Sequence, residues 1–288
     1  MIQNIAIIGG DLRIVKLAQM LAKDKINVKT YALEKAEELK QIDNIQICKS
    51  LEETILNTDS IICPIPISKN NIEINTPFSD EKIIIDELFE NVKNKTIIAG
   101  SINQNIDSIA KKYNINIIDI LDNEELVILN TIATAEGAVQ IAMEETDKTI
   151  HRSNVLILGF GRVGKTVAKM FYGIGANVYC EARKNSDLAW IKTYGYEPIK
   201  LDNLNKSLNK FDIIINTIPA LVIKKEQLQY MKKECLIIDL ASSPGGVDTK
   251  EAEKNNIKTI LALALPGKVA PITSAEYIKD TIYNILEK

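Results

Sequence analysis

Three glycines with a fixed spacing are the residues of this chain whose pattern points most directly to chemistry. The sequence VLILGFGRVGKTVA places Gly159, Gly161 and Gly164 between an apolar run and a helix-forming run. In such a turn the first glycine allows a tight exit from a strand, the second lets the backbone approach a pyrophosphate, and the third lets helix and strand pack closely. The helix N-terminus then offers unpaired N–H groups to the phosphates. The pattern predicts a dinucleotide-binding turn.

The residues after the next expected strand, Asn177–Cys180, bear on which dinucleotide binds. NAD-binding folds end this strand in an acid that binds the ribose 2′-hydroxyl, about twenty residues past the glycine turn. That spacing points to Ala182, and Arg183, Lys184 and Ser186 follow closely. A small residue followed by cations and a hydroxyl suits a 2′-phosphate. The sequence therefore favours NADP(H).

NAD(H) stays open as the less favoured cofactor, because a shift of one residue would make Glu181 the acid that binds the ribose. For Asp239 a carboxylate that closes a turn or caps a helix is favoured over a cofactor contact, which stays open. The expected cofactor-binding residues lie in the glycine turn and after the following strands. They are Gly159, Phe160, Gly161, Arg162, Val163, Gly164, Ala182, Arg183, Lys184, Ser186, Thr217, Ile218, Pro219, Asp239 and Ala241.

Composition excludes several classes of function. The 288 residues are 46% hydrophobic and 25% charged, with a net charge of −3, which gives no electrostatic reason to bind nucleic acid or anionic lipid. We expect no membrane helix, because no apolar run approaches the roughly eighteen residues that one needs. We expect no signal peptide either, because the first residues lack its basic segment. The four cysteines lack CxxC or metal-ligand spacing. We expect a cytoplasmic protein without a metal.

Strand and helix patterns alternate along almost the whole chain, which predicts an α/β fold with two doubly wound, Rossmann-like domains and parallel sheets. The expected domains are residues 1–130 with a returning helix at 272–288, and residues 151–271, joined by a long helix at 131–150. The expected strands are Asn4–Ile8, Asn27–Ala32, Ser60–Cys63, Thr96–Ala99, Ile115–Ile118, Val155–Leu158, Asn177–Cys180, Ile213–Asn216, Leu236–Leu240 and Lys258–Leu261.

The first domain begins like the second but changes the phosphate turn. After Gly9 and Gly10, Asp11 stands where the second glycine would be and Ile14 where the third would be. We therefore do not expect a dinucleotide in this domain. Arg13, in the first turn of the following helix, is open between binding a substrate carboxylate and pairing with an acid of its own domain.

Polar or Pro/Gly-rich segments follow several strands, on the edge where open α/β sheets bind ligands. They are residues 216–219, 239–246 and 265–271, with residues 130–137 at the domain junction. We expect them to converge on one cleft that holds an anionic substrate. The expected substrate-binding residues are Arg13, Thr131, Thr134, Ser242 and Lys268.

The chain's one histidine, His151, precedes the strand that leads into the glycine turn, so it is expected at the opposite edge of the sheet. The sequence also lacks a recognisable Ser/His/Asp or Cys/His arrangement. No catalytic acid or base is assigned. Either another residue is the base, or the reaction needs little enzymatic proton abstraction.

Several segments together resemble the family of dipicolinate synthase A subunits: IAIIGGDLR, TAEGAVQIAMEETDKTIH, LGFGRVG, NTIP, DLASSPGG and LPGKVAP, in this order. The resemblance covers about residues 4–287. It implies NADP-linked oxidation of dihydrodipicolinate to dipicolinate with a flavoprotein-like B subunit, in the mother cell of a sporulating bacterium. Ser243 and Ile272 stand where the family pattern often has Arg and Lys, which leaves the contacts to the substrate carboxylates open. A homo-oligomer is also expected.

Two alternatives remain. One is another NADP-dependent dehydrogenase, of the shikimate or methylenetetrahydrofolate type, to which NTIP and PGKVAP are locally similar. The other is a non-catalytic subunit in which nucleotide binding closes the cleft and regulates a partner.

Overall fold

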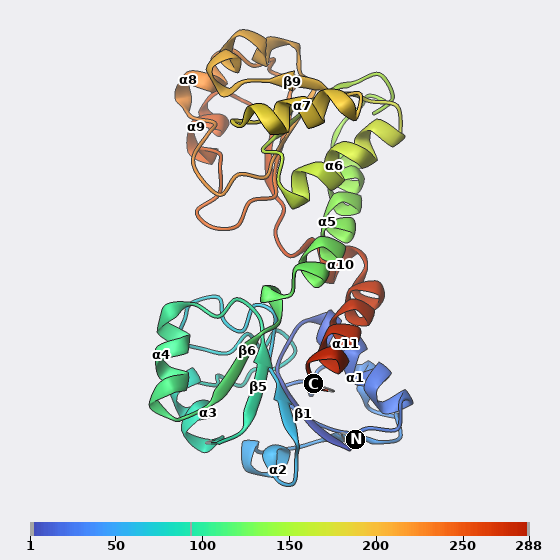
Figure 1. Cartoon of the computed structure of the whole chain (residues 1–288), viewed down its shortest axis with the longest axis vertical. Coiled ribbons are helices and arrows are strands. Elements are labelled where there is room, and N and C mark those ends of the chain that lie inside the picture. Colours follow the sequence, from blue (N-terminus) through green and yellow to red (C-terminus); the bar gives the residue numbers. More distant parts are fainter. Residues whose placement is uncertain (1–2, 93, 287–288) are drawn as a thin grey trace. The chain divides into compact units, whose positions relative to one another are not determined.

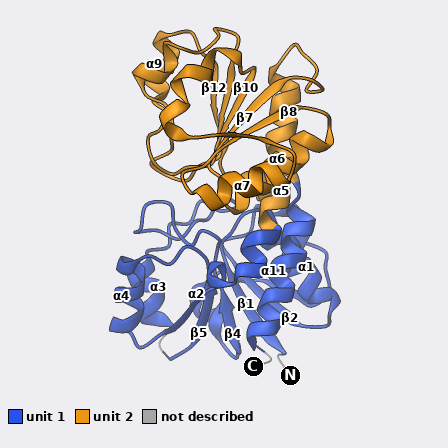
Figure 2. Cartoon of the chain, turned by 45° about the horizontal axis from the view of Figure 1, so that its top comes forward, with its two compact units in different colours: residues 1–129, 270–288 blue, residues 130–269 orange. Residues whose placement is uncertain are grey.

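Two compact units make up the computed structural model, which describes residues 3–92 and 94–286. Unit 1 consists of Met1–Leu129 with Ala270–Lys288, and unit 2 of Asn130–Val269 (Figure 2). Each unit contains a six-stranded sheet in which all neighbouring strands are parallel. The predicted α/β fold with parallel sheets is confirmed.

Unit 1 has the strand order β3-β2-β1-β4-β5-β6. Helices α1 and α11 cover one face of its sheet, and α3 and α4 cover the other (Figure 1). The strands are β1 Asn4–Ile8, β2 Asn27–Tyr31, β3 Ile45–Ile47, β4 Ser60–Ile62, β5 Thr96–Ala99 and β6 Asn116–Asp119. The α-helices are α1 Leu12–Lys23, α2 Leu51–Ile55, α3 Ile85–Asn91, α4 Gln104–Lys112 and α11 Pro271–Leu286, with short 3₁₀ turns η1 Glu37–Leu39 and η2 Ile120–Asp122.

Unit 2 repeats this order as β9-β8-β7-β10-β11-β12, so the chain reverses direction across the sheet between β7 and β10. Ligands of open parallel sheets bind at such a point. The strands are β7 Asn154–Leu158, β8 Asn177–Glu181, β9 Glu197–Ile199, β10 Ile213–Asn216, β11 Leu236–Asp239 and β12 Thr259–Leu261. The helices are α5 Glu124–Glu145, which begins in unit 1, α6 Arg162–Gly173, α7 Asn185–Thr193, α8 Lys225–Leu228, α9 Thr249–Lys254 and α10 Leu265–Val269, with 3₁₀ turns η3 Leu201–Asn203 and η4 Asn205–Lys210.

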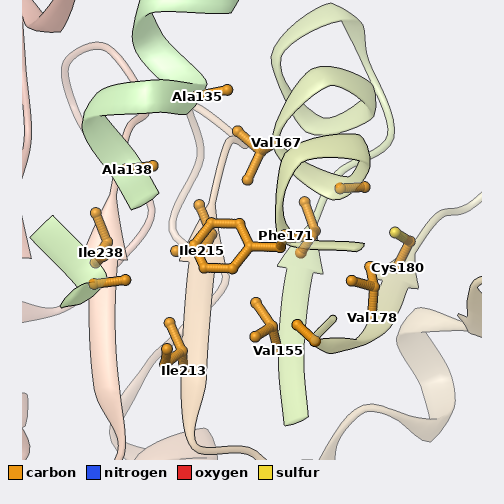
Figure 3. Packing of buried hydrophobic residues seen from close by; sticks show 14 of the residues in the cluster. Ala135, Ala138, Val155, Val167, Phe171, Val178, Cys180, Ile213, Ile215 and Ile238 are labelled. Atoms are coloured by element: carbon orange, nitrogen blue, oxygen red, sulfur yellow. The ribbon is translucent and has the colours of Figure 1, made fainter. Parts of the chain in front are cut away.

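The central strands of unit 2 are buried on both faces, which explains their unbroken apolar sequences. On one face the Phe171 ring of α6 lies beside Ile215 of β10, with Val155 and Val178 on the neighbouring strands (Figure 3). All four side chains are almost fully buried. This core fixes α6 against the sheet, and α6 begins at the glycine turn.

The observed elements differ from the predicted ones mainly at their ends and at the sheet edges. β3 and β9 were not predicted, because each is a three-residue edge strand with too few positions for a pattern. Residues 265–271, expected as a turn, instead contain α10, the connecting Ala270 and the first residue of α11, and residues 130–137 lie inside α5. Pro271 suits the first position of α11, where no N–H is needed.

Helix α5 also corrects two further expectations. It runs over Glu124–Glu145 rather than 131–150, and it is long and apolar enough to span a membrane by length and composition alone, although no such segment was expected. Its Ala135, Ala138 and Ala142 belong to the buried core of unit 2. A core helix of a soluble protein passes the same test, so the finding alone is weak support for a membrane span.

Candidate cofactor site

The glycine turn joins the end of β7 to the start of α6. Gly159 has a φ of +88°, a conformation that favours glycine, and a Cβ on Gly164 would stand 2.1 Å from the carbonyl oxygen of Gly159. A Cβ on Gly161 would meet nothing within 4 Å. The first and third glycines are therefore required by the fold itself. The second leaves open space at the N-terminus of a twelve-residue helix, where a ligand phosphate can approach the backbone.

A hollow of about 450 Å³ opens at this turn. Its size is in the range of pockets that bind small molecules, roughly 300–1,000 Å³. The turn, the segment after β8 and the segment after β10 supply the walls. The lining residues are Gly159, Phe160, Gly161, Arg162, Val163, Glu181, Ala182, Arg183, Lys184, Asp187, Thr217, Ile218 and Pro219.

Glu181 is the buried acid of this hollow. It is the last residue of β8, one position beyond the predicted end of that strand, and only 1% of its surface is exposed. Its Oε2 accepts a hydrogen bond from the backbone N–H of Gly159 at 3.3 Å, while Oε1 is buried without a partner among the described residues. Burial raises the pKa of this carboxyl, and the bond from Gly159 and the charge of Arg183 oppose that rise only in part. An unpaired buried oxygen costs free energy, so a ligand donor at Oε1 would stabilise the site.

The cations predicted to bind the 2′-phosphate of the cofactor are exposed at the rim of the same hollow. Arg183 and Lys184 line it, whereas the exposed Ser186 does not. The buried Ala182 lines it as well. Asp187, in the first turn of α7, also lines the hollow, although it was not among the predicted residues. A single acid at a helix N-terminus commonly serves only to stabilise the helix dipole, so its sequence position gave no signal.

Asp239 and Ala241 do not line the hollow; they belong to a hydrogen-bonded turn at the end of β11. The buried Asp239 carboxylate accepts from the Asn216 side chain at 2.7 Å and from the backbone N–H groups of Ala241 at 3.1 Å and Gly246 at 2.8 Å. The Asn216 amide also donates to the carbonyl of Ile218 at 3.0 Å. This network ties the ends of β10 and β11 together and holds in place the segment that carries Thr217 and Ile218.

In unit 1 the first two backbone N–H groups of the equivalent turn donate to carbonyl groups of the chain. The N–H of Gly9 donates to the carbonyl of Tyr31 at 2.9 Å, and that of Gly10 donates to the carbonyl of Asn75 at 3.0 Å. Asp11 caps α1 by accepting from the backbone N–H of Arg13 at 3.0 Å. Asp11 thus places a carboxylate at the position where Gly161 leaves open space in unit 2.

The Arg13 side chain is buried and held within its own unit. Its Nε donates to both Asp11 carboxylate oxygens, at 3.0 and 3.1 Å, and its Nη2 donates to Asp11 at 2.8 Å and to the carbonyl of Ile65. The intra-domain pairing left open by the sequence is therefore present. Among the described residues, Nη1 has no partner.

The other expected substrate residues are all in unit 2, and none lines the hollow. The hydroxyls of Thr131 and Thr166 are 2.7 Å apart, and the Thr134 hydroxyl donates to the carbonyl of Asn130 at 3.1 Å. Ser242 and Lys268 are exposed, and their side chains have no hydrogen bond among the described residues. Those two side chains are free to meet an anion.

The described part of the chain offers no metal site and little support for a thiolate nucleophile. No group of three His, Cys, Asp or Glu side chains there could hold a metal ion. All four cysteines are buried, and burial raises the pKa of Cys63 and Cys235 to about 12, so these thiols stay protonated at neutral pH. His151 lies against Gly175, before β7 and away from the glycine turn.

Comparisons with known proteins agree with this architecture. Residues 4–121 match the family described as the N-terminal domain of the dipicolinate synthase A subunit. Residues 128–251 match the NAD-binding domain of D-isomer-specific 2-hydroxyacid dehydrogenases. L-alanine dehydrogenase, with a TM-score of 0.67 at 14% identity, shares the fold.

Relatives of full length are more specific. The chain is 34% identical over 285 residues to the dipicolinate synthase A subunit of Bacillus subtilis, covering 98% of this chain and 95% of the relative. The crystal structure of the same subunit from Bacillus halodurans superposes with a TM-score of 0.89 at 34% identity, covering 99% and 98% of the two chains. A shikimate dehydrogenase (NADP(+)) of Methanococcus maripaludis is 25% identical over 235 residues, covering 70% of this chain and 84% of the relative. The chain therefore has an NAD(P)-binding domain and belongs to the family of dipicolinate synthase A subunits.

Proposed function

We propose that the chain is the nucleotide-binding subunit of an oxidoreductase that converts dihydrodipicolinate to dipicolinate with a B subunit, in the cytoplasm of a spore-forming cell. The observation that carries the proposal is the similarity to the dipicolinate synthase A subunit along almost the whole of both chains. The open glycine turn with its buried, half-satisfied Glu181 supports the binding of a dinucleotide at β7.

The nicotinamide of a bound dinucleotide supplies the hydride acceptor. The substrate ring loses a hydride from a saturated carbon and a proton from its neighbour, and the products are dipicolinate, the reduced cofactor and H⁺. Because the ring becomes aromatic, positioning accounts for much of the acceleration that is needed. A chain whose one histidine, His151, precedes β7 suits such a reaction.

The choice between NAD(H) and NADP(H) depends on side chains that make opposite demands. The free Oε1 of Glu181 suits the ribose hydroxyls of NAD(H), whereas Arg183 and Lys184 suit a 2′-phosphate. A 2′-phosphate beside the buried carboxylate would also meet like charge. We place more weight on Glu181 and propose NAD(H) as the tighter ligand. The sequence spacing points to Ala182 as the position of the acid and therefore favours NADP(H). In the structure β8 ends one residue earlier, at Glu181.

For the substrate carboxylates we propose Lys268 and Ser242, because both side chains are exposed and have no partner among the described residues. The Nη1 of Arg13 is a further candidate, with the rest of that guanidinium fixed by Asp11 and Ile65. We also propose Thr131 and Thr134 of α5. Their hydroxyls can exchange their present hydrogen bonds for hydrogen bonds to a substrate carboxylate.

A shikimate-type dehydrogenase is the second candidate, favoured by the match to the Methanococcus maripaludis enzyme over most of its length. Such an enzyme would turn over its substrate as a single chain. A purely nucleotide-sensing subunit is the third, and it would bind the cofactor without transferring hydride.

Reconstitution separates these functions. The purified chain is mixed with its B subunit, NAD⁺ or NADP⁺ and freshly made dihydrodipicolinate, and dipicolinate is followed by its absorbance. We expect formation faster than the spontaneous background only when both subunits are present. No acceleration at any subunit ratio would refute the proposal. Shikimate oxidation by the chain alone would support the second candidate, and cofactor binding without turnover of any substrate would support the third.

A further inference from the structure

A second hollow lies on unit 2, at the edge of the sheet where α7 runs beside β9 (Figure 1). Its volume is about 590 Å³. It shares no lining residue with the hollow at the glycine turn, although α7 contributes to both. Cavities of this size commonly hold a small molecule, about 300–1,000 Å³ being usual.

The wall of this second hollow is strongly cationic. Lys192 of α7, Lys200 after β9 and Lys210 of η4 line it, and Glu197 is its one acid. None of the three ammonium groups has a carboxylate partner among the described residues. Three positive charges against one negative charge leave a net charge of +2, in a chain whose overall net charge is −3. The concentration of unpaired cations favours an anionic ligand.

The remaining polar groups of the hollow are likewise unused. The side chains of Asn185, Asn203 and Ser207 all line it, and none has a hydrogen-bond partner within the described chain. They add neutral donors to the cations. Such convergent polar groups around a hollow are what fixes the orientation of a bound ligand.

The floor of the hollow is apolar and includes a ring. Tyr179 of β8, Leu188 of α7 and Pro198 of β9 contribute to it. The Lys210 ammonium lies 4.1 Å from the centre of the Tyr179 ring, and Phe211 packs against the same ring with centroids 5.2 Å apart. Tyr179 is thereby fixed from two sides, so the floor is preformed. A ligand that suits it has an apolar body and anionic groups at its periphery.

We propose that this hollow, lined by Lys192, Lys200 and Lys210 over Tyr179, binds a small organic dianion built on a ring. The net charge of its wall fits two carboxylates, and its floor fits the ring between them. The choice of a pyridine dicarboxylate as this dianion rests on the proposed function. The charge and shape of the site are independent of that function. The enzyme would then bind its own class of product away from the cofactor.

The test follows backbone amides of the isolated chain by two-dimensional NMR during titration with pyridine-2,6-dicarboxylate. We expect saturable shifts at Asn203 and Ser207. In Lys192→Gln/Lys200→Gln the dissociation constant should rise at least ten-fold, because two cations that would pair with the carboxylates are lost. The matched control Lys225→Gln/Lys250→Gln, which removes two exposed lysines of the same unit, should bind like the unchanged chain.

Two simpler ligands test the class. Pyridine has the ring without charge, and inorganic phosphate has charge without the ring, so both should bind at least ten-fold more weakly. The proposal is overturned if those amides show no saturable shift up to about 10 mM, if both double variants bind alike, or if phosphate binds as tightly as the dicarboxylate. Shifts at Ser242 and Lys268 report separately on the residues proposed for the substrate carboxylates. Their absence alongside shifts at Ser207 would count against the proposed function alone.

Discussion

The backbone N–H of Gly159 donates to Oε2 of Glu181 at 3.3 Å, which joins the first glycine of the dinucleotide turn to the last residue of the neighbouring strand. The other oxygen of Glu181 is buried and has no partner in the part of the chain that the structure describes. One carboxylate thus both braces the turn and presents an unused acceptor to the hollow. Several consequences for binding and stability can be measured.

Replacing Glu181 should change which cofactor binds. In Glu181→Gln we expect the dissociation constant of NAD(H) to rise about ten-fold, because hydrogen bonds to a charged acceptor contribute about 1.5–3 kcal/mol. The affinity for NADP(H) should hold or increase, since like charge near a 2′-phosphate is removed. Calorimetric titration with both cofactors measures this, and Glu253→Gln, on the surface of α9, is the control. Equal weakening of both cofactors would contradict the role of Glu181.

The same variant should alter stability with a defined pH dependence. Burial raises the pKa of Glu181 above 4.5 in the folded chain. Between that value and the raised pKa the folded chain holds more protons than the unfolded chain, so the free energy of unfolding falls as pH rises. Glu181→Gln should therefore be more stable than the unchanged chain at pH 7, by about 1 kcal/mol. The gain should vanish by about pH 4. Urea unfolding at both pH values checks this, and a gain that grows on acidification would be inconsistent with it.

Arg183→Ala tests the opposite side of the same hollow. The residue is exposed at the rim, and a lost contact to a 2′-phosphate affects NADP(H) only. We expect NADP(H) binding to weaken several-fold while NAD(H) binding changes little. Fluorescence titration with the two reduced cofactors provides the comparison. If NAD(H) weakens by the same factor, Arg183 does not discriminate between them.

Two glycines of the turn should respond to alanine in different ways. A Cβ at Gly164 would stand 2.1 Å from the backbone oxygen of Gly159, so Gly164→Ala should destabilise the fold by about 1–3 kcal/mol or more. A Cβ at Gly161 meets nothing within 4 Å, so Gly161→Ala should fold normally and lose dinucleotide affinity, because the methyl group occupies the approach of the pyrophosphate. Thermal unfolding and cofactor titration of both variants measure this. Unchanged cofactor binding in Gly161→Ala would place the phosphates elsewhere.

Sequence patterns predicted the alternation of strands and helices because buried parallel strands are continuous apolar runs, as in the three isoleucines that begin Ile213–Asn216. They could not predict the edge strands β3 and β9, whose three residues carry too little pattern. The turn at 265–271 was mistaken because its Pro and Gly residues are typical of loops, yet Pro266 and Gly267 are tolerated in the short helix α10.

The glycine turn was the part of the site most accessible from sequence, since its spacing alone encodes the close approaches at Gly159 and Gly164. The role of Glu181 was harder to assign, because a one-residue difference in where β8 ends decides whether the acid faces the hollow. The pair between Arg13 and Asp11 joins residues two positions apart, whereas the bond from Arg13 to the carbonyl of Ile65 spans 52 positions, which no local pattern encodes.

Direct hydride transfer to the cofactor of this chain is the central claim, and isotope transfer tests it. Dihydrodipicolinate deuterated at its saturated ring carbons is oxidised by the assembled enzyme with NAD⁺ or NADP⁺, and the reduced nicotinamide is analysed by NMR and mass spectrometry. We expect deuterium at C4 of the nicotinamide, with one reduced cofactor formed per dipicolinate. Dipicolinate formation without that label, or without stoichiometric reduction of the cofactor, would contradict it.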